Sequence, residues 1–106
     1  MEYKIVFIPE AAKDYKDLDG SVKKSINIKI EELKKNPFLG EKLGHKFNID
    51  LTGFYKIYVY GKKFRIVYRM ITPEKIEILE VWGIGKREKE EIYRTIGKRL
   101  QEEKNN

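Results

Sequence analysis

The stretch FYKIYVYGKKFRIVYRMI, residues 54–71, indicates the fold most directly. Aromatic and β-branched residues dominate it, and GKK at 61–63 divides it at a spacing that suits an antiparallel hairpin. A third run of the same kind, KIEILEVWG at 75–83, follows after only TPE. The sequence therefore predicts a meander of three antiparallel strands.

Helical periods flank this meander. YKIVFI at 3–8 reads as a first strand that joins the sheet, and helices are predicted over 9–20 and from about 21 to 36. EKLGHKFNIDLTG at 41–53 has no periodicity, so we expect a loop or short irregular strand. After Gly85 the helical period returns, with apolar residues every four positions.

The predicted fold class is α+β. We expect a small, antiparallel-rich twisted sheet with an N-terminal helical hairpin and a C-terminal helix, in the order β-α-α-β-β-β-α. The 106 residues are 41% hydrophobic, which suits one modest core, and no linker or repeat divides them. Residues 1–106 are therefore predicted to form a single domain.

Charge and composition narrow the function. The chain carries 23 Lys and Arg against 17 Asp and Glu, a net charge of +6, which favours a polyanion such as nucleic acid as partner. With no Cys there is no disulfide, thiol nucleophile or thiolate zinc site. No apolar run approaches a membrane span of about 20 residues. We expect a cytoplasmic protein with no membrane contact, no metal and no cofactor.

Alternation along the predicted strands gathers cations and aromatic rings. Phe54, Lys56, Tyr58 and Tyr60 share one face of their strand, and Arg65 shares a face of the next strand with Val67 and Arg69. If these faces coincide, Lys86, Arg87 and Tyr93 at the start of the last helix close a basic, aromatic concavity. Such a surface can bind RNA through phosphate contacts and base stacking, whereas the alternative is a solvated strand face.

Further residues have two interpretations each. Lys62, Lys63, Lys86 and Arg69 are counted as RNA-binding cations, although Arg69 is also placed to pair with Glu80 across strands. Trp82 is expected in the core beneath the last helix. His45, the one histidine, is expected on a surface loop.

The same cluster contains the parts for RNA cleavage without a metal. A 2′-hydroxyl must lose its proton, the equatorial phosphate charge must be neutralised and the 5′-oxygen must be protonated. Clustered cations lower the pKa of a neighbouring lysine, which makes its amine a candidate base. In GKREKEEIY, residues 85–93, cations in the first turn of a helix face the positive end of its dipole, so a phosphate nearby would account for them.

FYKIYVYGKKFRIVYRM, followed by ILEVWGIGKREKEEIYRTIGKRL, resembles the second half of the RelE toxins of bacterial toxin–antitoxin modules, within the RelE/ParE superfamily. The opening FIPEAAKDYKDL is similar to the family's first helix. The resemblance implies a toxin that cuts messenger RNA in the ribosomal A site by 2′-hydroxyl attack, without metal. It also implies contacts with 16S ribosomal RNA, a cognate antitoxin, and a toxin–antitoxin hetero-oligomer that binds operator DNA.

The resemblance also assigns roles by position. Lys56 and Arg65 would stabilise charge at the scissile phosphate, Arg87 would protonate or stabilise the departing 5′-oxygen, and Tyr93 would stack on or orient a base. Where the RelE pattern has a second lysine, the presumed general base, this sequence has Tyr58. An ordinary tyrosine pKa lies near ~10, so Lys56, Tyr58 or a ribosomal group remains open as the base. The alternatives are a ParE-like inhibitor of DNA gyrase and a non-catalytic RNA- or antitoxin-binding homologue.

Overall fold

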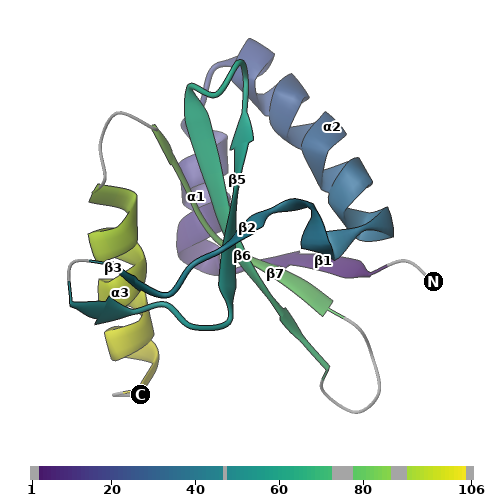
Figure 1. Cartoon of the computed structure of the whole chain (residues 1–106). Coiled ribbons are helices and arrows are strands. Elements are labelled where there is room, and N and C mark those ends of the chain that lie inside the picture. Colours follow the sequence, from purple (N-terminus) through teal and green to yellow (C-terminus); the bar gives the residue numbers. More distant parts are fainter. Residues whose placement is uncertain (1–2, 47, 73–77, 87–90, 105–106) are drawn as a thin grey trace.

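The computed structural model describes residues 3–46, 48–72, 78–86 and 91–104. Its central feature is a five-stranded sheet in the order β1-β7-β6-β5-β2, with β1 parallel to β7 and the other neighbours antiparallel (Figure 1). The elements in chain order are β1 Lys4–Phe7, α1 Pro9–Lys16, α2 Gly20–Lys35, η1 Pro37–Leu39, β2 Glu41–Lys42, β3 His45–Lys46, β4 Ile49–Asp50, β5 Phe54–Val59, β6 Phe64–Ile71, β7 Ile78–Lys86 and α3 Glu91–Lys104.

The predicted α+β class, the helical hairpin and the three-stranded meander are confirmed. The first helix has Pro at its first position, and α2 ends at Lys35, before Asn36 and Pro37, because Pro disfavours helical backbone in the residue ahead of it. Strand β1 joins the sheet beside β7, so the first and last strands are neighbours. Strand β1 thereby forms one edge of the sheet, and its pairing links the N-terminal segment to the meander.

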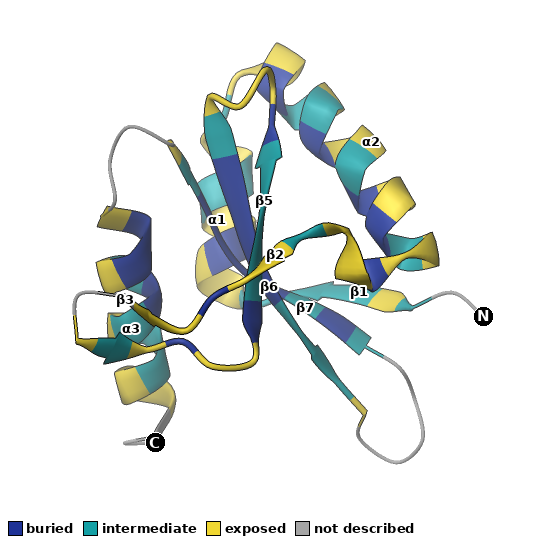
Figure 2. Ribbon diagram, in the orientation of Figure 1, coloured by how far each residue is buried: buried dark blue, intermediate teal, exposed yellow. Residues whose placement is uncertain are grey.

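Each face of the sheet is covered by a different helix layer (Figures 1 and 2). On one face α1 and α2 pack on an aliphatic core that includes Ile26, Leu33, Ile66 and Val81. On the other face α3 takes part in a second cluster, whose buried members are Leu43, Leu51, Phe54, Val67, Trp82, Ile92, Tyr93 and Ile96. Trp82 lies in this cluster, as expected for a residue beneath the last helix.

Strand β7 differs from the prediction. It does not end at Gly83 but continues to Lys86, so Lys86 belongs to a strand and not to the first turn of the last helix. Glycine at Gly83 and Gly85 reflects close packing, because a Cβ atom on Gly83 would lie 2.6 Å from Ile96 Cδ1. The absence of side chains at these two positions lets α3 approach β7 closely. The sequence pattern predicts the end of the strand there, because glycine usually interrupts a strand.

A β-bulge lies in the middle of β7. Val67 pairs with Gly83 while Tyr68 pairs with Val81, so Trp82 is an extra residue on that strand. The bulge reverses the alternation, and Ile84 therefore faces the α1–α2 side although Trp82, two residues earlier, faces α3. Both Trp82 and Gly83 consequently lie under α3.

The aperiodic segment 41–53 forms three strands of two residues each. Strand β2 pairs with β5 and forms one edge of the sheet, whereas β3 and β4 form a separate hairpin beside α3 (Figure 1). Ile49 of this hairpin lies against Gly97 of α3, where a Cβ atom would approach Ile49 Cγ2 to 2.8 Å. The last helix is thus held between the sheet and this hairpin.

Candidate active site

Lys56 and Tyr58 lie side by side on β5, two residues apart and therefore on the same face. The Lys56 ammonium donates a hydrogen bond to the Tyr58 hydroxyl across 3.1 Å, and its Nζ atom lies 5.0 Å from the centre of the Tyr58 ring. Alternation predicted this pair. The structure adds that the tyrosine at the position of the missing lysine contacts the lysine that remains.

Arg65 faces the same region from β6, where it is directly opposite Tyr58. Its guanidinium carbon lies 5.7 Å from the Tyr58 ring centre and 5.1 Å from that of Tyr93, so the cation sits between two aromatic rings. Only 6% of the residue is exposed. Cation–π contacts of this kind are strongest where water is excluded, so the two rings hold the guanidinium in a fixed place.

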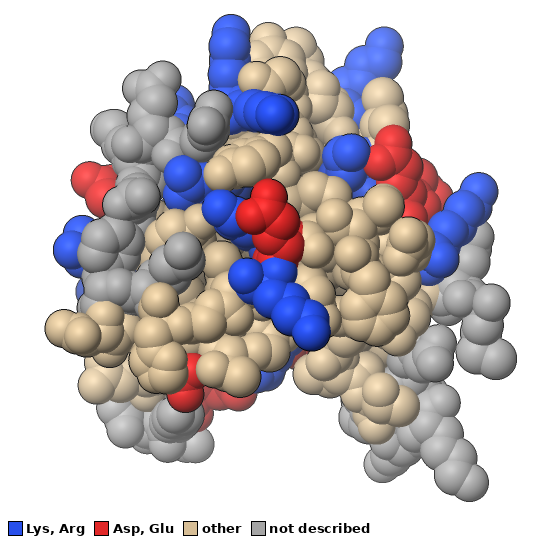
Figure 3. Space-filling model, in the orientation of Figure 1, with Lys and Arg blue, Asp and Glu red and all other residues tan. Residues whose placement is uncertain are grey.

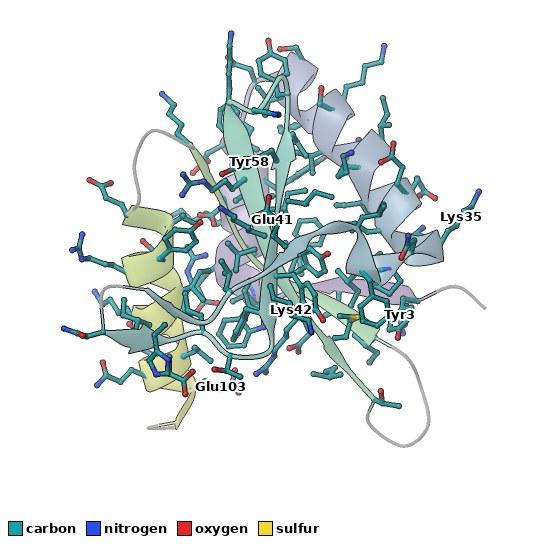
Figure 4. All side chains as sticks on the ribbon, in the orientation of Figure 1. Tyr3, Lys35, Glu41, Lys42, Tyr58 and Glu103 are labelled. Carbon is teal, nitrogen blue, oxygen red and sulfur yellow. The ribbon has the colours of Figure 1, made fainter. Side chains whose placement is uncertain are left out.

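Glu41 is a member of this cluster that the sequence analysis missed. The β2–β5 register puts Glu41 opposite Lys56, and its Oε2 atom lies 3.9 Å from the Lys56 Nζ atom. Figure 4 shows Glu41 and Tyr58 over the middle of the sheet, and Figure 3 shows an acidic patch there with basic side chains beside it. The side chain of Glu41 is 71% exposed, whereas that of Lys56 is 16% exposed.

The surroundings of Lys56 keep its amine protonated. Burial alone lowers the pKa of Lys56, but the hydrogen bond to Tyr58 and the charges of Tyr93, Tyr58 and Glu41 together outweigh burial and raise it above 10.5. The expectation that neighbouring cations would lower the lysine pKa is therefore wrong in direction. Lys56 is suited to bind and neutralise a phosphate, and unsuited to accept a proton near neutral pH.

Tyr93 comes to this site from α3 but is 3% exposed. Its ring packs on the Arg65 guanidinium and within the α3 cluster. The role of stacking on a base stays a prediction, and the ring is buried in this arrangement. What the observed contacts support directly is that Tyr93 fixes Arg65.

Arg69 has a different position. Its Nε atom donates to Glu80 Oε1 across 2.7 Å, its Nη2 atom lies 3.6 Å from Glu103 Oε1, and the guanidinium carbon lies 4.6 Å from the Trp82 ring centre. The predicted cross-strand pairing with Glu80 is confirmed. These contacts join β6, β7 and α3, so the structure favours a structural role over RNA binding for Arg69.

The remaining predicted RNA-binding cations lie at the edges of the site. Lys62 and Lys63 are exposed in the turn between β5 and β6, and Lys86 is exposed at the end of β7. Alternation predicts that Tyr60 shares the face of Lys56 and Tyr58, and this prediction is wrong. Tyr60 follows the end of β5 with a φ of 54°, and its hydroxyl oxygen lies 3.3 Å from Ser21 Oγ of α2. Arg87 lies outside the described residues.

No group of three or more His, Asp or Glu side chains within the described residues is arranged to hold a metal ion. His45 lies on the surface in the β3–β4 hairpin, with its Nε2 atom 4.0 Å from Asp50 Oδ1. Among the helices in the described part of the chain, none is long and apolar enough to cross a membrane.

The arrangement suits a phosphodiester. Lys56 and Arg65 supply two fixed positive charges, Tyr58 lies between them, and Glu41 supplies a carboxylate at their margin. Paired cations stabilise the charge that grows on equatorial oxygens during attack at phosphorus. A carboxylate and a hydroxyl are groups that can exchange protons with the nucleophile and leaving group.

Comparison with known proteins agrees with this chemistry. Residues 5–91 match the model of a family described as the ParE toxin of type II toxin–antitoxin system, parDE. The mRNA interferase toxin RelE of Escherichia coli strain K12 is 29% identical over 100 residues, which cover 94% of this chain and 99% of that protein.

Two solved structures have the same fold. A mutant of the E. coli toxin RelE in the free state superposes with a TM-score of 0.73 at 26% identity, over 94% of this chain and 99% of that one. The same toxin mutant in complex with a peptide of the antitoxin RelBc gives a TM-score of 0.65 at 28% identity, over 89% and 93%. The comparison spans the helical hairpin, the sheet and the last helix together.

Proposed function

We propose an enzymatic function for this chain, which belongs to the ParE toxin family of type II toxin–antitoxin systems: it is a RelE-type toxin that cuts messenger RNA in the ribosomal A site and so stops translation. The observation that carries the proposal is the position of Lys56 and Arg65, two cations held beside Tyr58 on one face of the sheet. The relative named as an mRNA interferase supports the substrate class.

In this proposal Lys56 and Arg65 bind the non-bridging oxygens of the scissile phosphate. The 2′-oxygen attacks phosphorus, the bond to the 5′-oxygen breaks, and the products are a 2′,3′-cyclic phosphate and a 5′-hydroxyl. The reaction requires no metal because the two cations neutralise the charge on phosphorus. Arg87, by its place in the RelE pattern, would assist the departing oxygen.

The geometry also accounts for why Tyr58 is compatible with activity. It accepts a hydrogen bond from Lys56 and packs beneath Arg65, so it orients both cations. A lysine at the same position would add a third positive charge beside them. We infer that Tyr58 is a positioning residue, and that the non-catalytic alternative does not follow from the missing lysine.

The proposed partners follow from the family. The ribosome would position the messenger, with 16S ribosomal RNA touching the basic surface that Lys62, Lys63 and Lys86 extend. A cognate antitoxin would silence the toxin, as RelBc binds RelE in the solved complex. Their complex would bind operator DNA, and the toxin would act in the cytoplasm.

Primer extension on cellular messages after brief induction tests the proposal. Lys56→Met should remove the cuts, while Lys35→Met, which neutralises an exposed lysine at the end of α2, should leave them. Cuts should fall at fixed positions within codons and vanish when translation is blocked. Growth arrest with intact messages would contradict the proposal and move the target to DNA gyrase, the alternative that the ParE name of the family suggests.

A further inference from the structure

A carboxylate in the middle of a basic, RNA-facing surface needs an explanation. Two other acidic side chains near the sheet form ion pairs with arginines: Asp14 of α1 accepts hydrogen bonds from Arg99, and Glu80 of β7 accepts one from Arg69. Glu41 instead approaches Lys56, a proposed phosphate ligand, at 3.9 Å. It repels RNA there, so it needs a function that offsets this cost.

We propose that Glu41 is the general base of the cleavage reaction, and that its carboxylate takes the proton from the attacking 2′-hydroxyl. This inference rests on the proposed function and deepens it. It assigns the role that the sequence left open when Tyr58 replaced the second lysine of the RelE pattern.

The position of Glu41 suits the role. In RNA the 2′-oxygen is separated from the adjacent phosphorus by only the ribose C2′, C3′ and the 3′-oxygen, so binding of that phosphate by Lys56 brings the hydroxyl near. Glu41 Oε2 lies 3.9 Å from the same Nζ atom, so the carboxylate lies within reach of a nucleotide whose phosphate Lys56 holds. Its side chain is 71% exposed, so substrate can reach it.

The other candidates in the described site fit less well. The contacts of Lys56 raise its pKa and keep it charged, so its amine has no free electron pair near neutral pH. The phenol oxygen of Tyr58 accepts a hydrogen bond from that ammonium and would have to lose its own proton before it could act as a base. A carboxylate needs no such preparation, because it is ordinarily ionised at neutral pH.

The step balances within the cluster. The 2′-hydroxyl proton passes to the Glu41 carboxylate as the 2′-oxygen bonds to phosphorus. The phosphorus bond to the 5′-oxygen breaks, and that oxygen takes a proton from water, while Lys56 and Arg65 stay charged on the non-bridging oxygens. Glu41, now a neutral acid, gives its proton to the hydroxide that is left, and the starting state is restored.

The test compares Glu41→Gln with Glu31→Gln in a reconstituted ribosome cleavage assay under single-turnover conditions. Glu31 is a matched control, because it is 66% exposed, lies 3.0 Å from Lys34 and sits on α2 away from the site. Glu41→Gln should lower the rate constant roughly 100-fold or more at saturating toxin, the usual contribution of a general base. Ribosome binding should not weaken, and Glu31→Gln should cleave at the unaltered rate.

Chemical rescue separates a base from a residue that only shapes the site. Glu41→Ala should regain cleavage when acetate is added, and should not respond to chloride at equal ionic strength. Unchanged or faster cleavage by Glu41→Gln would overturn the proposal. Faster cleavage would mean that the carboxylate of the wild-type protein only repels the phosphate, so that removing its charge helps the reaction. That result leaves the endoribonuclease function intact, whereas a wild-type toxin that cuts no message on the ribosome overturns both.

Discussion

The two faces of the central sheet are built from different chemistry. The face under α1 and α2 buries aliphatic and aromatic side chains, such as Ile26, Ile66 and Val81. The face under α3 also buries apolar residues, but it carries Arg65 and Arg69 among aromatic rings. Adjacent residues of one strand, Arg65 and Ile66, thus belong to different environments, each less than 10% exposed.

This contrast shows how a small domain holds charges where it needs them. Guanidinium groups on the α3 face lie over Tyr58, Tyr93 and Trp82, which replace part of the water lost on burial. The α1–α2 face supplies the stability that such a site does not. Substitutions of the cations on the α3 face should therefore alter activity, and substitutions in the core of the α1–α2 face should alter folding.

The largest expected effect is on activity. Arg65→Met keeps an unbranched, apolar stem between Tyr58 and Tyr93 but removes the charge, so cleavage should fall about 10²–10³-fold, the usual loss for one group that stabilises the transition state. The free energy of unfolding should change by less than about 1.5 kcal/mol. Single-turnover cleavage and urea denaturation measure the two quantities. Ile66→Val, on the opposite face, should lose about 1 kcal/mol of stability and keep its cleavage rate. Loss of stability without loss of cleavage in Arg65→Met, or loss of cleavage in Ile66→Val, would contradict the division between the two faces.

The second effect concerns alkaline pH and the α1–α2 face. Burial raises the pKa of Tyr68 to about 12, although the hydrogen bond from the Gly40 amide opposes the shift. Because an unfolded tyrosine loses its proton near ~10, the stabilisation is complete below that pH and is lost as pH rises from about 10 to 12, up to about 2–3 kcal/mol.

Urea denaturation at pH 8, 10 and 11 measures this loss. Tyr68→Phe should be less stable at pH 8, because it removes the hydroxyl that donates to Pro37 O, but it should lose less stability on going to pH 11. Equal pH dependence of the two proteins would show that Tyr68 does not carry the effect.

The third effect concerns how closely α3 packs on β7, and it is measured as a change in stability. Gly83→Ala should destabilise the fold by about 1–2 kcal/mol, because the new Cβ atom would lie 2.6 Å from Ile96 Cδ1 and 3.0 Å from Ile92 Cδ1. Gly44→Ala is the control, since its Cβ atom would have nothing within 4 Å. Thermal unfolding compares them. If both variants melted alike, the close approach of α3 to β7 would not matter for stability.

The smallest effect lies at the hairpin tip, beyond both faces. Gly61 and Lys62 have φ values of 61° and 65°, and the Lys63 amide donates to Tyr60 O, as in a turn with two left-handed central residues. Lys62→Gly should stabilise the fold by up to about 1 kcal/mol, because glycine adopts this conformation without steric cost. Lys63→Gly, at a residue without positive φ, should destabilise it slightly in the same melting experiment.

Much of the site could be predicted, because it lies on long strands. Alternation along β5 and β6 was enough to bring Lys56, Tyr58 and Arg65 together and to place Arg69 opposite Glu80. Glu41 could not be found in this way. A two-residue strand has no period, and only its pairing with β5 carries Glu41 to Lys56.

Backbone irregularities account for other errors. A positive φ at Tyr60 turns it from the predicted face toward α2. The glycines at Gly83 and Gly85 were read as the end of a strand because Gly is a breaker in most contexts, yet here their missing side chains make room for Ile92 and Ile96. In both cases the outcome depends on a neighbour distant in sequence, which local periodicity does not contain.

The bulge at Trp82 has a consequence for how this strand tolerates insertion and deletion. If Trp82 is skipped, Leu79, Val81 and Ile84 face one side and Glu80, Gly83 and Gly85 the other, in unbroken alternation. The strand is therefore a regular one with a single tryptophan inserted. Loss of that residue would leave the register of its neighbours in place, although it would remove a buried side chain that contacts Phe54, Arg69 and Glu80. A deletion at this point therefore preserves the alternation of β7, whereas a deletion elsewhere in the strand would reverse it.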